Sequence, residues 1–310
     1  MTTPDYDQVL AREDPELRRK RGVYFTPESL AYHVVHQVDH FLRRDFDIPG
    51  GFANLGVEIL EPAAGSGNFL TTIIRRIYQE FVFDHEVWRE YVPRHLLPRL
   101  TGIELLPGAC DAARRKLRAL FEELHCPLPL DAFLPIIQAD TISEPLDCSE
   151  PDAWNRWLRS RKKRSAPKLP LVIIGNPPWS GLPSNQGPWI KALLRGKDVV
   201  TGEEFENYYH IDGNPSGEKN LRGLSDDYVR FLRYAHWRIE RRGLGILAFI
   251  TPAGLLNNFS LAGARQSLLE TFDKIYVIAD SGSPAKGGKT LGEVLGVKVR
   301  VAISIFIKSP

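Results

Sequence analysis

The stretch that decides the fold runs from residue 57 to residue 70 and reads VEILEPAAGSGNFL. A short apolar run leads directly into a glycine-rich turn, and a helical pattern follows the turn. Gly65 and Gly67 let the backbone bend sharply and approach a ligand closely, because glycine has no Cβ. A Gly-x-Gly pair alone is weak evidence for a ligand site, and the alternative is a tight strand–helix turn that binds no ligand. The stretch predicts a strand, a ligand-binding loop and a helix, in that order.

The same alternation continues along the chain. Seven short apolar runs are predicted as strands, at residues 57–61, 100–104, 135–139, 171–175, 244–251, 274–279 and 300–307. Helices are predicted near 68–80, 108–125, 152–160, 226–241 and 260–271, and another after Thr26-Pro27, where Thr26 is expected as the N-cap. This order predicts an α/β, Rossmann-like fold with a mixed, mostly parallel seven-stranded sheet and helices on both faces. A ligand is expected where the strand order reverses.

Composition limits the possible classes of protein. The 310 residues, 43% of them hydrophobic, suffice for one large α/β domain or two small ones. The net charge of +2 leaves any binding of phosphates to local patches. Three cysteines (Cys110, Cys126 and Cys148) without a C-x-x-C spacing favour packing roles and a reducing compartment over disulfides or zinc. With a polar start and no apolar run long enough to span a bilayer, a cytoplasmic protein without a membrane contact or a metal is expected.

Several segments are ambiguous. Residues 1–22 form a charged arm, and a basic run at 159–168 is either a solvated loop or a phosphate-contacting edge. Residues 180–225 are rich in glycine, proline and asparagine, which predicts either a functional lid or a disordered insert. Trp189, Tyr208 and Tyr209 could anchor that insert. The one-sided helical spacing of His33, His36 and His40 favours a solvent-facing surface over a metal site.

Two acidic residues follow predicted strands. Glu104 ends the second strand, where a carboxylate can accept hydrogen bonds from ribose hydroxyls. Asp140 follows the third strand and can accept a hydrogen bond from an adenine amino group. Either residue alone would more often be a helix cap or a surface charge. Their order after the glycine-rich loop is what favours a ligand-binding role for both.

The chemically decisive stretch is residues 171–179, which read LVIIGNPPW. An exocyclic base nitrogen is a poor nucleophile, because its lone pair is delocalised into the ring. Asn176 Oδ1 and the Pro177 carbonyl can accept both amino hydrogens and draw that nitrogen toward tetrahedral geometry. Pro177-Pro178 stiffens the loop, and Trp179 offers a flat face on which an extruded base can stack. A rigid Pro-Pro turn beside a buried tryptophan is the alternative.

In their order, these motifs resemble the amino-group DNA methyltransferases of the gamma arrangement, in particular the methyltransferase segment of large single-chain restriction–modification enzymes. The resemblance covers about residues 20–307, including a helix near 227–231 and the later strands. It implies an S-adenosylmethionine-dependent methyltransferase fold over residues 23–310 and methylation of adenine N6 in DNA by base flipping. It assigns catalysis to Asn176, Pro177, Pro178 and Trp179. It assigns the cofactor, S-adenosylmethionine, to Tyr24, Phe25, Thr26, Glu61, Pro62, Ala63, Gly65, Gly67, Asn68, Phe69, Glu104, Leu105, Asp140, Thr141 and Asn176.

The chain departs from the family pattern in two places. Trp179 stands where enzymes acting on adenine more often carry Tyr or Phe, so cytosine N4 stays an alternative acceptor, as do an RNA base and a protein glutamine. No target recognition domain follows the last predicted strand, so DNA specificity is expected from a partner, from residues 180–225 or from a longer parent chain. A noncatalytic or partner-dependent fragment of a larger restriction enzyme is the remaining alternative.

Overall fold

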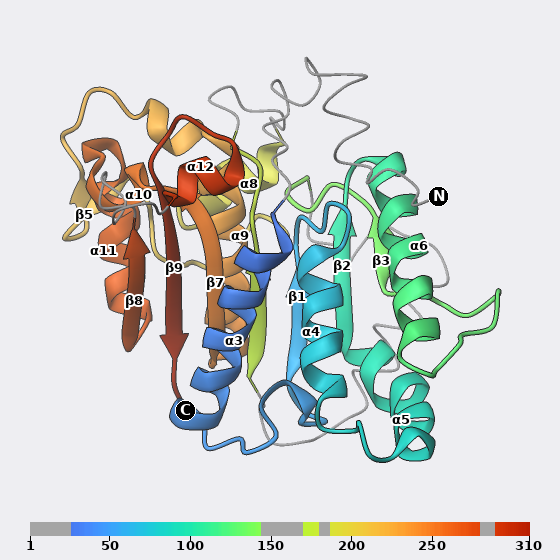
Figure 1. Ribbon diagram of the computed structural model, residues 1–310. Coiled ribbons are helices and arrows are strands. Elements are labelled where there is room, and N and C mark those ends of the chain that lie inside the picture. The colour runs from blue at the N-terminus through green and yellow to red at the C-terminus, as the bar shows by residue number, and fades with distance from the viewer. Residues whose placement is uncertain (1–25, 144–169, 180–186, 280–288) are drawn as a thin grey trace.

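The computed structural model describes residues 26–143, 170–179, 187–279 and 289–310. A seven-stranded sheet with the order β3-β2-β1-β4-β7-β9-β8 runs through the middle of the molecule (Figure 1). Strand β9 is antiparallel to both β7 and β8, and the remaining neighbours are parallel. The expected mixed, mostly parallel sheet is therefore confirmed.

The strands form close to where alternating apolar runs predict them. Their bounds are β1 Glu58–Glu61, β2 Leu100–Glu104, β3 Ile136–Gln138, β4 Leu171–Gly175, β7 Gly245–Pro252, β8 Lys274–Ala279 and β9 Val301–Lys308. Strand β4 is buried at every position, as expected for a central parallel strand covered on both faces. Edge strand β8 is largely exposed or half-buried.

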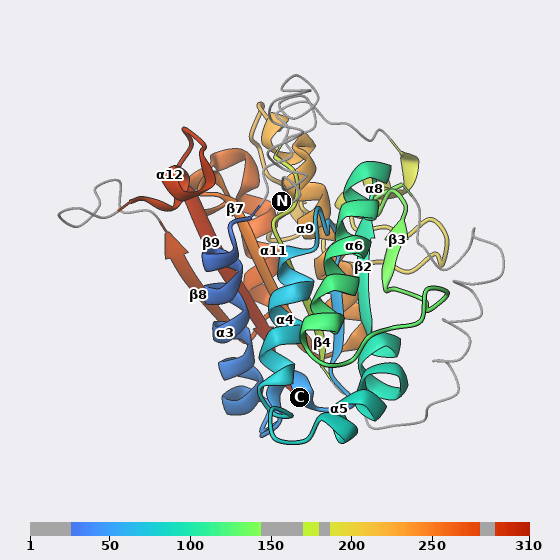
Figure 2. The ribbon, with the colours of Figure 1, turned by 45° about the vertical axis from the view of Figure 1, so that its right-hand side comes forward.

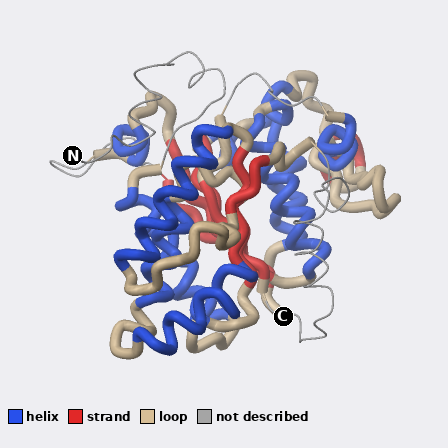
Figure 3. The backbone as a smooth tube through the Cα atoms, turned by 90° about the vertical axis from the view of Figure 1, so that its right-hand side faces the viewer, coloured by secondary structure: helices blue, strands red, loops and turns tan. Residues whose placement is uncertain are grey.

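Helices cover both faces of the sheet (Figures 1 and 2), and Figure 3 shows the strands enclosed between them. One face carries α3 Glu28–Asp45, α4 Asn68–Tyr78 and α6 Pro107–Glu123, and the other carries α9 Asp227–Arg242 and α11 Ala262–Thr271. Short helices complete the chain: η1 Gly51–Ala53, α5 His85–Tyr91, η2 Val92–Leu96, η3 Leu97–Arg99, α10 Gly254–Asn257, η5 Phe259–Leu261 and α12 Leu291–Leu295. The helix expected near 152–160 lies outside the described residues.

The described part of the 180–225 segment, from residue 187 onward, is folded onto α9. It contains α8 Pro188–Leu194, a small hairpin of β5 His210–Ile211 and β6 Asn214–Pro215, and η4 Arg222–Ser225. Trp189 and Tyr208 are 2% and 1% exposed and anchor it, as the sequence suggested. Tyr209 is half-buried, with the Arg195 guanidinium 4.7 Å from its ring centroid. A disordered insert is thus wrong for these residues.

Other local expectations met different outcomes. Helix α3 begins at Glu28 with Pro27 in the N-cap position and no side-chain cap, so the N-cap role expected of Thr26 is wrong. The Thr26 carbonyl instead accepts a hydrogen bond from Asn68. Of the three histidines predicted to face solvent on α3, His33 and His40 are exposed, and His36 is half-buried. Cys110 and Cys126 are buried packing residues, whereas Cys148, the arm at 1–22 and the basic run at 159–168 lie outside the described residues.

None of the described helices combines the length and hydropathy needed to cross a membrane.

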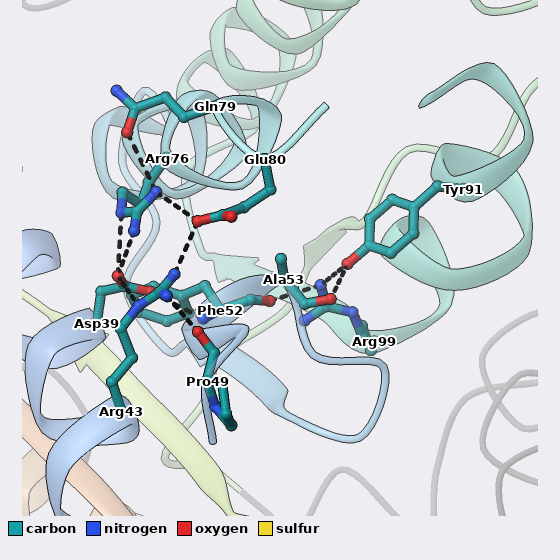
Figure 4. Close-up of polar contacts among 10 residues, drawn as sticks. All are labelled: Asp39, Arg43, Pro49, Phe52, Ala53, Arg76, Gln79, Glu80, Tyr91 and Arg99. Atoms are coloured by element: carbon teal, nitrogen blue, oxygen red, sulfur yellow. Dashed lines mark hydrogen bonds and ion pairs between the residues drawn. The ribbon is translucent and has the colours of Figure 1, made fainter. Parts of the chain in front are cut away.

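A polar cluster occupies the amino-end side of the sheet (Figure 4). The buried Asp39 carboxylate accepts hydrogen bonds from Arg43 Nε (3.0 Å), Arg76 Nε (3.0 Å) and the Phe52 backbone N–H (2.9 Å). Glu80 pairs with both of these arginines, at 2.8 Å and 3.1 Å. We call Asp39, Arg43, Arg76 and Glu80 the amino-end cluster. Because it joins α3 to α4 and to the turn at η1, it stabilises the layer that covers the sheet.

Beside this cluster in Figure 4, Arg99 is buried at the start of β2. Its guanidinium donates to the carbonyls of Val57 (2.9 Å) and Phe52 (2.7 Å) and to the Tyr91 hydroxyl. Tyr91 in turn donates to the Ala53 carbonyl at 2.7 Å. The buried cation thus satisfies backbone acceptors in the segment between η1 and β1.

Candidate functional site

The candidate site lies where the strand order reverses. Strands β1 and β4 are neighbours at the centre of the sheet, but the chain proceeds from β1 toward β3 on one side and from β4 toward β7 on the other. Because the chain leaves these two strands toward opposite sides of the sheet, a crevice forms at their carboxyl ends. A pocket with about 910 Å³ of empty space, part of it open to solvent, occupies this place.

The loop after β1 wraps closely around one end of the pocket. Gly65 and Gly67 have φ angles of 53° and 85°, in the left-handed region that favours glycine. A Cβ on Gly67 would lie 3.3 Å from the Ala113 Cβ, so glycine also permits close packing of the loop against α6. The Ala64 N–H donates to the Ile103 carbonyl at 2.8 Å and ties the loop to β2. These contacts fix the position of the glycine-rich loop at the carboxyl ends of the strands.

The Glu104 carboxylate, at the end of β2, faces this loop. Its Oε2 accepts from the Gly65 backbone N–H and its Oε1 from the Leu106 N–H, both at 2.8 Å. Burial raises the pKa of Glu104, and backbone hydrogen bonds oppose that rise. Each oxygen keeps a further lone pair for a ligand hydroxyl. Glu104 thus both orders the loop and presents acceptors to the pocket.

The Glu61 carboxylate, at the end of β1, is only 2% exposed and lies in the pocket wall. Burial raises its pKa well above the ordinary range, with a further rise from the nearby Glu104, while a backbone hydrogen bond from Leu70 and the charge of Lys116 lower it. Within the described residues, Glu61 Oε2 accepts no hydrogen bond. A buried acceptor of this kind is costly for folding, and such groups concentrate at functional sites.

The third strand contributes the pocket's opposite side. Asp140 Oδ1 accepts from the Ile142 N–H at 3.1 Å, which forms a tight turn directly after β3. Thr141 is buried and donates through Oγ1 to the Pro62 carbonyl at 2.5 Å. The hydroxyl therefore joins the β3 end to the glycine-rich loop, although 79 positions separate the two residues in the chain.

The Asn-Pro-Pro-Trp stretch follows β4 at the same edge. Asn176 is half-buried, with its Oδ1 shielded from solvent, and lines the pocket together with Pro178. Pro177 is buried, and Trp179 is 9% exposed and packs in the hydrophobic core. The stacking role expected for the Trp179 ring stays a prediction, as do the catalytic roles of the stretch.

The structure brings most of the predicted cofactor residues together in one pocket. Those that line it are Thr26, Glu61, Pro62, Ala63, Gly65, Asn68, Phe69, Glu104, Leu105, Asp140, Thr141 and Asn176. Gly67 shapes the loop behind the lining, and Tyr24 and Phe25 lie outside the described residues.

Sequence reasoning did not assign a site role to several further lining residues: Ala64, Ser66, Leu106, Ala109, Ala139, Ile142 and Phe231. Most of them adjoin residues already predicted, so their positions next to the predicted strand ends could have identified them as pocket residues. Phe231 is different, because it reaches the pocket from α9, far along the chain from the glycine-rich loop. Only the packing of α9 against β4 and β7 reveals it.

Comparison with known proteins gives structural likeness alone. A scan of protein-family models and a search of curated proteins return no match. Among solved structures, the chain is similar to a DrdV–DNA complex, with 22% identity, a TM-score of 0.71, and coverage of 98% of this chain and 28% of that one. It is also similar to the ATP-dependent Type ISP restriction–modification enzyme LlaBIII bound to DNA, with 24% identity, a TM-score of 0.68 and coverage of 93% and 19%. The Type IIL restriction–modification enzyme MmeI in complex with DNA gives 19% identity, a TM-score of 0.57 and coverage of 100% and 41%.

These likenesses and the strand order together establish a Rossmann-like α/β fold with a mixed, mostly parallel seven-stranded sheet. The chain spans between 19% and 41% of the length of these three proteins. At identities below one quarter, the likeness is one of fold.

Proposed function

We propose that this chain is an S-adenosylmethionine-dependent methyltransferase that methylates the N6 amino group of adenine in DNA. The observation that carries the proposal is one pocket lined at once by the glycine-rich loop, the strand-end acids Glu61 and Glu104, and the Asn176–Pro178 turn. A cofactor site and a set of amino-group acceptors thus adjoin each other at the strand-order reversal.

The residues in the pocket fit the cofactor group by group. Glu61, with a buried oxygen that no described residue satisfies, suits the cationic amino group of the methionine part. Glu104 suits the ribose hydroxyls, and Asp140 suits the amino group of the adenine ring. Leu105 and Phe231 supply apolar walls for that ring. S-adenosylmethionine, when bound, supplies an electrophilic methyl group on a sulfonium centre.

The chain's own part in the reaction is to orient the acceptor amino group. Asn176 Oδ1 and the Pro177 carbonyl accept its two hydrogens, and the double proline keeps both acceptors in place before the reaction. Prealigned acceptors stabilise the charge that develops on the nitrogen, and such groups contribute about 100- to 1000-fold in rate.

DNA is favoured as the acceptor by two observations. The DrdV, LlaBIII and MmeI structures that resemble this chain all contain DNA. In addition, β9 runs antiparallel to β7 and so begins at the pocket edge, where Lys298 and Arg300 precede it and are exposed. The Ala253 N–H donates to the Arg300 carbonyl at 2.8 Å, which holds this segment next to the end of β7. Exposed cations at the pocket edge suit DNA phosphates.

The deciding experiment is transfer of radiolabelled methyl from S-adenosylmethionine to unmethylated genomic DNA, followed by nucleoside analysis. We expect N6-methyladenine in the wild type and a loss of at least about 100-fold in Asn176→Ala, with cofactor binding by calorimetry retained. Asn214→Ala, which removes an exposed asparagine at the start of β6, is the matched control and should transfer normally.

Other outcomes would replace the proposal. N4-methylcytosine would move the acceptor to cytosine, the alternative that Trp179 favours. Label in RNA or protein would change the substrate class. Cofactor binding without methyl transfer would indicate a catalytic domain that depends on a partner. This alternative is specific because the chain spans only 28% and 19% of the length of the DrdV and LlaBIII proteins.

A further inference from the structure

A chain of polar contacts joins three helices at one wall of the pocket. Asn68, the first residue of α4, donates through Nδ2 to the Thr26 carbonyl at 2.6 Å. Lys116, on α6, donates through Nζ to Asn68 Oδ1. The same ammonium lies 3.1 Å from the Glu28 carboxylate in the first turn of α3. Thr26 and Asn68 both line the pocket, and Lys116 stands behind them.

The contact with Lys116 determines which way the Asn68 amide faces. An ammonium group can only donate hydrogen bonds, so the amide atom that it contacts must be the oxygen. The Asn68 NH₂ group is therefore directed at the Thr26 carbonyl. Asn68 is 8% exposed, so a reversed amide would leave buried polar groups without partners.

We infer that Lys116 is a positioning residue for the cofactor, acting through Asn68 to hold Thr26 in the pocket wall. This inference rests on the proposed function, because it concerns the same cofactor pocket. Thr26 lies 42 positions before Asn68 in the chain, and this hydrogen bond joins Thr26 to the side of the pocket formed by the glycine-rich loop. The pair with Glu28 contributes little, since Glu28 is 75% exposed at its side chain.

Lys116 also acts on the pocket through its charge. Its ammonium favours the ionised form of Glu61, whereas burial and the neighbouring Glu104 carboxylate favour the protonated form and raise the pKa. A neutral side chain at position 116 removes the favourable contribution, so the pKa of Glu61 rises further. If Glu61 holds a cationic group, cofactor binding strengthens as pH rises through that pKa, and the profile moves to higher pH without Lys116.

The test compares Lys116→Met with Lys116→Arg in the full chain. Calorimetry measures the Kd of S-adenosylhomocysteine over the range from about pH 6 to about pH 9, alongside kcat at saturating S-adenosylmethionine. We expect Lys116→Met to raise Kd by about tenfold, to shift its pH profile upward and to leave kcat within about twofold. Lys116→Arg, which keeps the charge and the donors, should restore most of the affinity.

Arg75→Met is the matched control. Arg75 pairs with Glu123 through two contacts of 2.6 Å and 2.7 Å, and so joins the same two helices, α4 and α6, away from the pocket. It should leave both Kd and its pH profile unchanged.

The two failures are distinguishable. A wild type that binds no S-adenosylhomocysteine would remove the proposed function, and this inference with it. Tight wild-type binding with an unchanged Kd and pH profile in Lys116→Met would overturn the inference alone. An equal loss in Arg75→Met and Lys116→Met would also overturn it, because the role would then be to join the helices.

Discussion

The two ends of the sheet treat buried carboxylates in opposite ways. At the amino-end cluster, the Asp39 carboxylate accepts hydrogen bonds from two arginines and a backbone N–H (Figure 4). At the pocket, Glu61 is buried still more deeply, and its Oε2 accepts none within the described residues. Buried polar groups that serve folding are normally satisfied, whereas groups that serve a ligand keep unused capacity. The unsatisfied Glu61 oxygen therefore favours a ligand role for that carboxylate, whereas the satisfied Asp39 carboxylate serves the fold.

Ionisation of the two pocket carboxylates costs folding free energy. Burial raises the pKa of both Glu61 and Glu104, so each opposes folding when it is ionised.

The largest expected effect is on stability, from Asp39→Ala. Removal of this carboxylate leaves the Phe52 N–H without its acceptor, and leaves the Arg43 and Arg76 guanidinium groups with Glu80 as the remaining carboxylate of the cluster. We expect the free energy of unfolding to fall by about 3 kcal/mol, as when one partner of a buried ion pair is removed. Denaturant titration measures this loss, and the cofactor Kd of the folded protein should stay unchanged. Glu90→Ala, at an exposed pair of 3.3 Å with Arg94, is the control and should cost about 0.5 kcal/mol or less. A loss as small as that in Asp39→Ala would contradict the structural role of the cluster.

Glu61→Gln should have effects of opposite sign on stability and binding. Because the pKa of Glu61 is raised in the folded protein, its ionisation costs stability as pH rises from the ordinary value of 4.5 through the folded value. A neutral glutamine avoids that cost, so Tm at alkaline pH should exceed that of the wild type, and the difference should vanish in acid. The Kd of S-adenosylmethionine should rise by about 10- to 100-fold, since a charge-assisted hydrogen bond is lost.

Differential scanning calorimetry at two pH values and titration calorimetry measure these two effects. A Glu61→Gln variant that loses stability at alkaline pH would place Glu61 with the structural carboxylates, and the comparison between the two ends would fail.

The smallest effect is expected from Tyr91→Phe, at the amino end. The Tyr91 hydroxyl donates to the Ala53 carbonyl and accepts from Arg99, so its removal costs two hydrogen bonds but no charge. We expect a loss of about 1 to 2 kcal/mol in the free energy of unfolding and an unchanged cofactor Kd. A change in the cofactor Kd would show that the amino end of the sheet and the pocket are coupled through β2, so the two ends would not act independently.

Most of the fold could be predicted from the sequence, because strand and helix patterns are local. All seven strands form at the predicted runs, and three of them, β2, β4 and β8, have the predicted bounds. The errors fall where local preference and tertiary contacts compete. Thr26 has the side chain of a good N-cap, but its carbonyl is taken by Asn68 and the helix begins at Glu28. The compositionally irregular stretch from residue 187 folds because Trp189 and Tyr208 are buried against α9.

The sequence by itself determined the order of the seven strands and of the five long helices in the described residues, the glycine-rich loop and the identity of the strand-end residues Glu61, Glu104 and Asn176. These features follow from periodicity and from the conformational freedom of glycine, which act over a few neighbouring residues. Only the tertiary structure decided that Phe231 reaches the pocket, that Lys116 contacts Asn68, and that Glu61 keeps an unsatisfied oxygen while Asp39 does not. Burial and hydrogen-bond partners depend on elements that are distant in the chain, and no local pattern encodes them.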